Sequence, residues 1–170
     1  MHKILEMLRG GDKRSIGRSN EVVKIVLNEP GLFDTLFSGM LSDDPLISMR
    51  SADAVEKITA LYPEYLKPYK KILLTTLAKA EQPEIRWHVA PMLARLSLTT
   101  LEQKAVIEEL RVYMNDKSSI VKTMAMQAIY DLTERYEALR PLALLFIKEL
   151  VDIGTPAMKA RGKKLLPKLI

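Results

Sequence analysis

Few residues of this chain have the chemistry that catalysis or metal binding requires. The sequence contains two histidines, His2 and His88, and no cysteine. Glu84 precedes His88 by four positions, a spacing that on a helix usually gives a surface contact. Two ligands without a third or fourth hold a metal ion poorly, and a nucleophile–base–acid triad has almost no residues to draw on. We therefore expect no enzymatic activity, no metal and no cofactor.

Two other polar motifs are explained by turns. Gly10-Gly11-Asp12-Lys13 lacks the spacing of a Walker phosphate-binding loop, and it follows an expected helix rather than a strand. Asp43-Asp44 stands directly before Pro45, at a helix boundary where an acidic side chain caps the helix start. Neither motif predicts a site.

The residues that could bind a partner are aromatic and basic, and an internal repeat positions them. Four stretches align at intervals of 36 to 38 residues. In each, an apolar residue precedes a usually basic one, and apolar or small residues follow at positions six, seven and ten from the basic one. Repetition of this length indicates stacked units that cannot bury their apolar faces alone. The four stretches are Ile47–Ile58, Ile85–Leu96, Val121–Leu132 and Met158–Leu169.

Each stretch is preceded by a second helical pattern, so the expected unit is two helices joined by a short turn. Proline or a capping polar residue marks each turn, as in Asp43-Asp44-Pro45 and Gly154-Thr155-Pro156. The amino-terminal segment resembles a degraded fifth pair, with helices over residues 3–9 and 16–27, which makes about ten helices. The first helices of the four clear pairs are expected over residues 32–41, 65–77, 101–114 and 142–151.

Composition agrees with a helical, water-soluble chain. The 170 residues include seven glycines and 6% aromatic residues, which favours helices over sheets. The net charge is +5, and residues 153–170 carry five basic residues and no acid, so the remainder is neutral. The start of the chain reads as an amphipathic helix rather than a signal peptide, and no segment approaches the roughly 18 uncharged apolar residues of a membrane span. A cytoplasmic protein without a membrane partner is expected.

The repeated stretches resemble HEAT repeats, whose second helix typically opens with Asp-Pro, continues with a Val-Arg pair and then has Ala-Leu. The resemblance rests on Asp44-Pro45, Ile85-Arg86, Val121-Lys122, Ala54-Val55 and Ala128-Ile129. It implies an all-α, right-handed α-solenoid of about five helix pairs that mostly serves as a protein-binding scaffold. The whole chain, residues 1–170, is then one domain. Its amino-terminal pair covers about residues 1–29, and its repeats cover about residues 30–60, 61–98, 99–134 and 135–170.

Helical geometry predicts which side of each second helix remains free. At 100° per residue the repeated apolar positions cluster on one side, and positions one, five and eight after the basic position lie opposite. The HEAT resemblance places this free side on a concave surface with Trp87 and Tyr130 in its middle, and basic residues lie beside them. Packing of Trp87 between neighbouring pairs and ordinary solvation of the basic residues stay open as alternatives. The expected binding surface comprises Met49, Arg50, Asp53, Lys57, Trp87, His88, Arg95, Gln127, Tyr130, Arg161, Lys164 and Lys168.

A protein or peptide is the expected partner, and the expected function is a non-enzymatic scaffold or adaptor. Nucleic-acid binding is an alternative, because alkylpurine DNA glycosylases also place Trp, Asp and Arg on HEAT-like helices, and Trp87, Asp53 and Arg95 invite that comparison. A third alternative is an accessory subunit of a larger enzyme, as in HEAT-like bilin lyase subunits. A monomer is the default, although the apolar last helix could pair with another copy.

Overall fold

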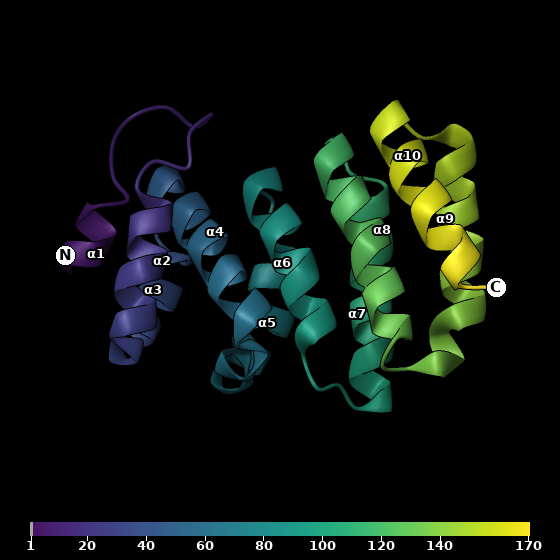
Figure 1. The fold of residues 1–170 in the computed structure, drawn as a ribbon, viewed down its shortest axis with the longest axis horizontal. Coiled ribbons are helices and arrows are strands. Elements are labelled where there is room, and N and C mark those ends of the chain that lie inside the picture. The colour runs from purple at the N-terminus through teal and green to yellow at the C-terminus, as the bar shows by residue number, and fades with distance from the viewer. Residues whose placement is uncertain (1) are drawn as a thin grey trace. The chain divides into compact units, whose positions relative to one another are not determined.

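The computed structural model describes residues 2–170, and the regular secondary structure of this part of the chain is all helical (Figure 1). It contains ten α-helices, five short 3₁₀ helices and no strand. The expected all-α class and the number of about ten helices are confirmed. The chain divides into two compact units, the first ending at Pro68 and the second running from Tyr69 to Ile170.

Unit 1 is built around one long helix, α4, Pro45–Leu61, which packs against α2 and α3. Asp44 caps α4, because its carboxylate accepts hydrogen bonds from the N–H groups of Leu46 and Ile47. Pro45 lies in the first turn, where its missing N–H group removes no helical hydrogen bond. The other elements are α1 (Lys3–Glu6), α2 (Ser19–Asn28), η1 (Pro30–Leu32), α3 (Phe33–Gly39) and η2 (Pro63–Tyr69), which extends to the first residue of unit 2.

Unit 2 contains three helices side by side. Helix α8, Ser119–Thr133, lies between α6, Pro83–Arg95, and α10, Pro156–Leu165, and packs against both (Figure 1). Helices α7 and α9 also pack against α8. The other elements of unit 2 are α5 (Lys70–Thr75), η3 (Leu77–Lys79), α7 (Thr100–Met114), η4 (Glu137–Leu139), α9 (Arg140–Ile153) and η5 (Leu166–Lys168).

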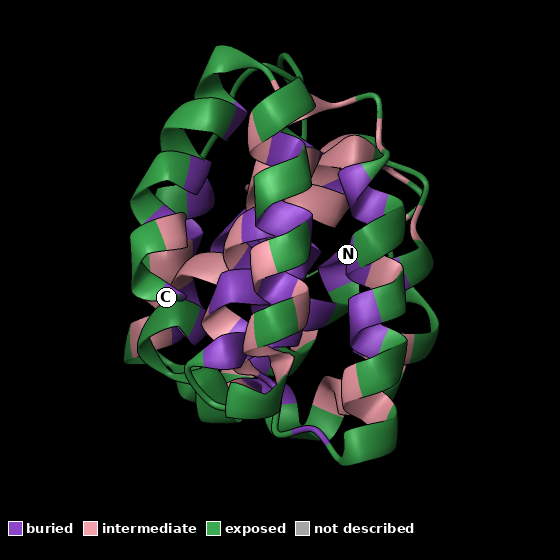
Figure 2. Ribbon diagram, turned by 90° about the vertical axis from the view of Figure 1, so that its right-hand side faces the viewer, coloured by how far each residue is buried: buried purple, intermediate pink, exposed green. Residues whose placement is uncertain are grey.

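Buried residues form stripes along most of the helices, which keep a less buried side (Figure 2). The central part of α4 is the exception, since all of residues 47–55 are buried. Helix α10 illustrates the striped pattern, since Met158, Gly162 and Leu165 are buried at spacings of three and four residues. Gly162 permits close packing between α9 and α10, because a Cβ atom at this position would collide with Val151. The opposite flanks of α10 are free for other contacts.

The first helix of the second pair differs from the expectation of one helix over residues 65–77. The structure instead has η2 through Tyr69, then α5, then η3. Pro68 lies inside η2, where it lacks an N–H donor and crowds the preceding turn, so a continuous α-helix is interrupted. Pro141, its equivalent in the repeat, lies in the first turn of α9, where a helix tolerates proline.

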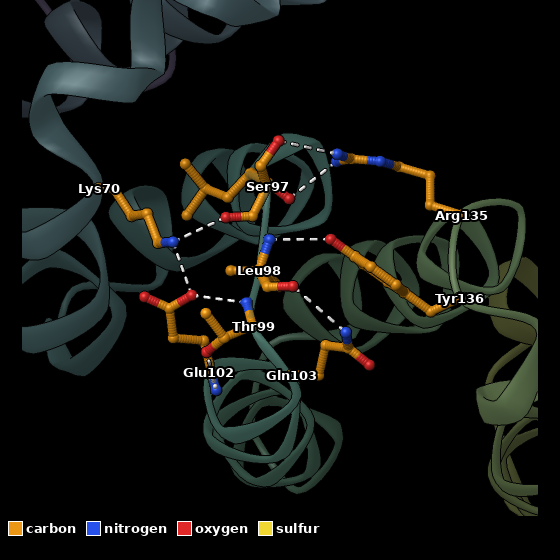
Figure 3. A network of polar contacts seen from close by, with 9 residues as sticks. Lys70, Ser97, Leu98, Thr99, Glu102, Gln103, Arg135 and Tyr136 are labelled. Carbon is orange, nitrogen blue, oxygen red and sulfur yellow. Dashed lines mark hydrogen bonds and ion pairs between the residues drawn. The ribbon is translucent and has the colours of Figure 1, made fainter.

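A network of polar contacts holds the turn between α6 and α7 from two sides (Figure 3). Lys70 approaches from one side and pairs with Glu102 at 2.6 Å. This hydrogen bond from Lys70 lowers the pKa of Glu102 below its usual value. From the other side the Tyr136 hydroxyl accepts a 2.8 Å hydrogen bond from the N–H group of Leu98. Glu102 also completes a capping box with Thr99 at the start of α7, so the turn has a fixed conformation.

Candidate binding surface on helices α6, α8 and α10

Helices α6, α8 and α10 each begin at a defined residue. The start of each helix determines which of its side chains reach the surface. Ser118 caps α8 through the N–H group of Val121, and Thr155 caps α10 through the N–H group of Met158. Pro83 and Pro156 occupy the first turns of α6 and α10. One candidate surface is formed by residues that share the less buried sides of these helices and of η5, which directly follows α10. We name it the α6–α8–α10 surface: Trp87, His88, Arg95, Gln127, Asp131, Arg161, Lys164 and Lys168.

A chain of polar contacts crosses from α8 to α10 at the centre of this surface. Gln127 Nε2 donates a 2.7 Å hydrogen bond to Asp131 Oδ1, one turn further along α8. Arg161 on α10 donates a 2.9 Å hydrogen bond to Gln127 Oε1. The Gln127 amide is thus oriented at both ends, and the two helices are joined by a defined polar contact.

Asp131 is the one acidic residue of the surface, and its environment is mixed. Partial burial raises its pKa, because it disfavours the charged form, whereas the hydrogen bond from Gln127 and the positive charges of Arg95 and Arg161 act in the opposite direction. The net effect is a pKa above the usual value. When ionised, Asp131 places a negative charge beside the arginines. Partial burial makes this charged form less favourable than it would be in water.

Trp87 and His88 lie on α6 and are both half-buried. Their rings meet edge to face, with centroids 5.9 Å apart. Trp87 is thus neither fully packed nor fully exposed, so part of the indole is accessible. A partly exposed aromatic ring beside charged groups is typical of a surface that binds another molecule.

Tyr130 contributes less surface than expected, since only 9% of it is exposed. Its ring lies under the ammonium group of Lys168, 5.6 Å from Nζ to the ring centroid. A hydrogen bond to Glu134 raises the pKa of the Tyr130 hydroxyl, because ionisation would place two negative charges together. Tyr130 therefore supports Lys168 from below, and the expectation of an exposed ring at the centre of the surface is corrected.

The expected surface residues of unit 1 have a different environment. Arg50 is only 1% exposed, and its guanidinium group donates hydrogen bonds to backbone carbonyls of the segment before α2. The distances are 2.8 Å to Leu8, 2.6 Å to Gly10, 3.1 Å to Asp12 and 3.1 Å to Ser15. The expectation that Arg50 is exposed is therefore wrong, because the loop of residues 10–17 covers it.

Asp53 and Met49 are also buried, at 7% and 6% exposure. Asp53 accepts a 2.5 Å hydrogen bond from the Ser19 hydroxyl of α2 and pairs with Lys57 at 2.6 Å. Lys57 remains half-buried and also donates to Asn20. Burial is the favoured state for the apolar side chain of Met49. The polar groups of α4 thus bind α2 and the loop before it, and the expectation that Asp53 and Met49 are exposed is corrected.

Asp131 is not among the surface residues expected from the sequence. Its spacing of four residues from Gln127 is the signal that could have identified it, since residues so spaced meet on a helix surface. Ser19 and Asn20 lie in the irregular amino-terminal segment, so the repeat gave no register from which their contacts could be predicted. Long-range contacts from a non-repetitive segment need the structure.

A cavity of about 310 Å³ in unit 2 offers no alternative site with evident chemistry. Its polar lining residues are two glutamates and a lysine, and the rest of the lining is apolar. Within residues 2–170, no group of three or more His, Cys, Asp or Glu side chains is arranged to hold a metal ion. The cavity is lined by Leu74, Ala78, Lys79, Leu93, Ala105, Val106, Glu108, Glu109 and Val112.

Comparison with known proteins leaves the family open. No protein-family model matches the sequence, and no curated protein matches it either. Among the described residues, 2–170, none of the helices has both the length and the apolar character needed to cross a membrane. The surface geometry is therefore the main guide to function.

Proposed function

We propose that this protein is a non-catalytic adaptor that binds a protein partner on the α6–α8–α10 surface. In this proposal the helix pairs form a HEAT-like right-handed solenoid, which is supported by the repeated spacing and by residues such as Asp44-Pro45 and Ile85-Arg86. The adaptor acts in the cytoplasm as a monomer. It uses no cofactor.

The observation that carries this proposal is the polar chain from Arg161 through Gln127 to Asp131. The half-buried Trp87 lies on α6, the helix that packs against α8. The polar chain joins two helices, so the surface is ordered before a partner arrives and less conformational entropy is lost on binding. Tryptophan and arginine are the residues that most often dominate the binding energy of protein interfaces. An ordered surface with both types fits a protein ligand.

Affinity capture from the cells that make this protein, followed by binding measurements with the purified partner, tests the proposal. Trp87→Ala is expected to weaken the captured complex about tenfold, which corresponds to about 1.4 kcal/mol. Leu101→Ala is the matched control, since Leu101 is a large apolar residue of the same unit, 78% exposed on α7. Equal retention of the partner by wild type, Trp87→Ala and Arg161→Ala, with all three folded by circular dichroism, would contradict the proposed surface.

Nucleic-acid binding is the second candidate, and the five basic residues of the carboxy-terminal segment favour it. Phosphate contacts release counterions, so the logarithm of duplex affinity should fall with the logarithm of salt concentration by about 0.9 for each phosphate contacted. A mobility-shift titration at low and high salt measures this slope. The absence of any shifted band at low salt rejects this candidate. A role as an accessory subunit of an enzyme is covered by the capture experiment, because the captured partner is then the enzyme.

A further inference from the structure

Three basic residues form one edge of the α6–α8–α10 surface, and we name Arg161, Lys164 and Lys168 the α10 basic edge. Arg161 and Lys164 lie on α10, and Lys168 is the last residue of η5, which directly follows α10. Spacings of three and four residues place the three side chains on the same flank of this carboxy-terminal segment, next to α8. All three are exposed. Among the described residues, 2–170, Lys164 and Lys168 form no ion pair, so their charges are not neutralised within the chain.

Helix α10 carries a second basic pair on its other flank. Lys159 and Lys163 are exposed and lie across the buried stripe from the α10 basic edge. They have the same charge as Lys164 and Lys168 and belong to the same carboxy-terminal segment, but they lie on the other flank of α10. Substitution of this pair changes the net charge as much as substitution of Lys164 and Lys168 does, so it separates the effect of position on ligand binding from the effect of net charge.

The spacing of the α10 basic edge fits an extended acidic chain. An α-helix rises about 1.5 Å per residue and a 3₁₀ helix about 2 Å, so Lys164 on α10 and Lys168 at the end of η5 are roughly 6–8 Å apart along the axis. Alternate residues of an extended chain point to the same side and are separated by about 6.6 Å. Carboxylates at every second position of a strand can therefore face successive cations of this edge.

The residues beside the edge favour a peptide over a nucleic acid. Asp131 places a carboxylate next to Arg95 and Arg161, where it would repel a phosphate backbone. The same carboxylate can accept N–H groups of an extended peptide, and the Gln127 amide next to it is already oriented. Unit 1 has nine basic and ten acidic residues, so it adds no positive field to attract a duplex.

We infer that the α10 basic edge binds an extended segment of the partner that carries Asp or Glu at alternate positions. This inference rests on the proposed adaptor function and names the chemistry of its partner. Arg161 and the two lysines contact the carboxylates, and Gln127 with Asp131 contacts the peptide backbone. Lys168 is supported in this position by the ring of Tyr130.

Fluorescence anisotropy with the full chain and a labelled peptide of alternating Glu and Ser tests this inference. A length of about ten residues covers the edge, because an extended chain spans about 3.3 Å per residue. The peptide is expected to bind at low salt and to lose affinity as salt screens the charges, whereas a peptide with Gln in place of Glu does not bind. Lys164→Ala with Lys168→Ala is expected to weaken binding about fivefold to tenfold, since each exposed charge contact contributes only modestly to the affinity.

Lys159→Ala with Lys163→Ala is the matched control and is expected to change affinity less than about twofold. Equal losses for the two double variants overturn the inference, because the peptide then responds to net charge alone. Tighter binding of a DNA duplex than of the peptide, with loss in the Lys164/Lys168 variant, overturns it in favour of nucleic acid. If the Glu peptide fails to bind while the captured partner still requires Trp87, the inference is wrong and the adaptor function stands.

Discussion

Helix α4 in unit 1 and the segment formed by α10 and η5 in unit 2 carry polar residues at the same positions of the repeat, yet these residues have opposite environments. Arg50, Asp53 and Lys57 of α4 correspond in the repeat to Arg161 and Lys164 of α10 and Lys168 of η5. Arg50 and Asp53 are buried, whereas all three residues of the carboxy-terminal segment are exposed. The comparison shows that repeat position alone does not determine whether a side chain can bind a partner.

The difference arises from what covers each helix. In unit 1 the loop of residues 10–17 and the start of α2 supply acceptors for the polar groups of α4: backbone carbonyls for Arg50, and Asn20 for Lys57. A buried guanidinium group is stable only when its N–H groups are satisfied, and four carbonyls satisfy it here. In α10 the corresponding arginine has one side-chain acceptor, Gln127, and remains exposed. The row of α4 therefore stabilises unit 1, and the row of α10 remains open to a ligand.

The largest effect that tests this comparison is expected for Arg50→Ala. The substitution leaves four carbonyls without their donor and removes the contacts of a buried side chain, so we expect a loss of about 3 kcal/mol in the free energy of unfolding. Urea unfolding followed by circular dichroism measures it. Trypsin should also cleave faster after Lys13 and Arg14, because the loop loses its anchor.

Arg161→Ala is the matched control, since it removes the same side chain from the corresponding position of α10. Its effect on stability is expected to stay within about 0.5 kcal/mol, as is usual for exposed residues. Similar losses of stability in the two variants would show that the two rows do not differ in role.

A smaller effect is expected for Gly17→Ala, in the loop that covers Arg50. Gly17 has a φ of +54°, which residues with a side chain rarely adopt, and a Cβ atom there would lie 2.8 Å from Arg50 Cζ. We expect a loss of about 2 kcal/mol in the free energy of unfolding, from backbone strain and displacement of the guanidinium group. Gly31→Ala is the control, because its φ is not positive and no atom lies within 4 Å of the added Cβ. A neutral Gly17→Ala would mean that the loop does not hold Arg50 tightly.

The sequence predicted the helical class and the turns, because these depend on local spacing and capping. Asp44, Ser118 and Thr155 cap helices where the turns were expected. The burial of Arg50 and Asp53 could not be predicted, since it depends on a segment outside the repeat that contacts them across more than thirty residues of sequence. The interruption at Pro68 is intermediate: the proline was visible in the sequence, but whether it starts or breaks a helix is decided by the surrounding packing.

The smallest effect on the free energy of unfolding is expected for Asp131→Asn. The sign of this effect and its dependence on pH distinguish Asp131 from the stabilising polar row of α4. The pKa of Asp131 is raised in the folded state, so the folded protein holds this proton more tightly than the unfolded chain does. This residue therefore favours folding more as the pH falls through its folded pKa toward the ordinary Asp value, and it opposes folding above that window. Asp131→Asn removes the contribution, so at neutral pH it should be neutral or stabilising by about 0.5 kcal/mol or less, while Asp53→Asn, which weakens a buried ion pair with Lys57, is destabilising. Urea unfolding of both variants at neutral and mildly acidic pH measures these changes. A clear destabilisation by Asp131→Asn at neutral pH would show that Asp131 stabilises the fold, as the polar groups of unit 1 do, and does not belong to a surface that is open to a ligand.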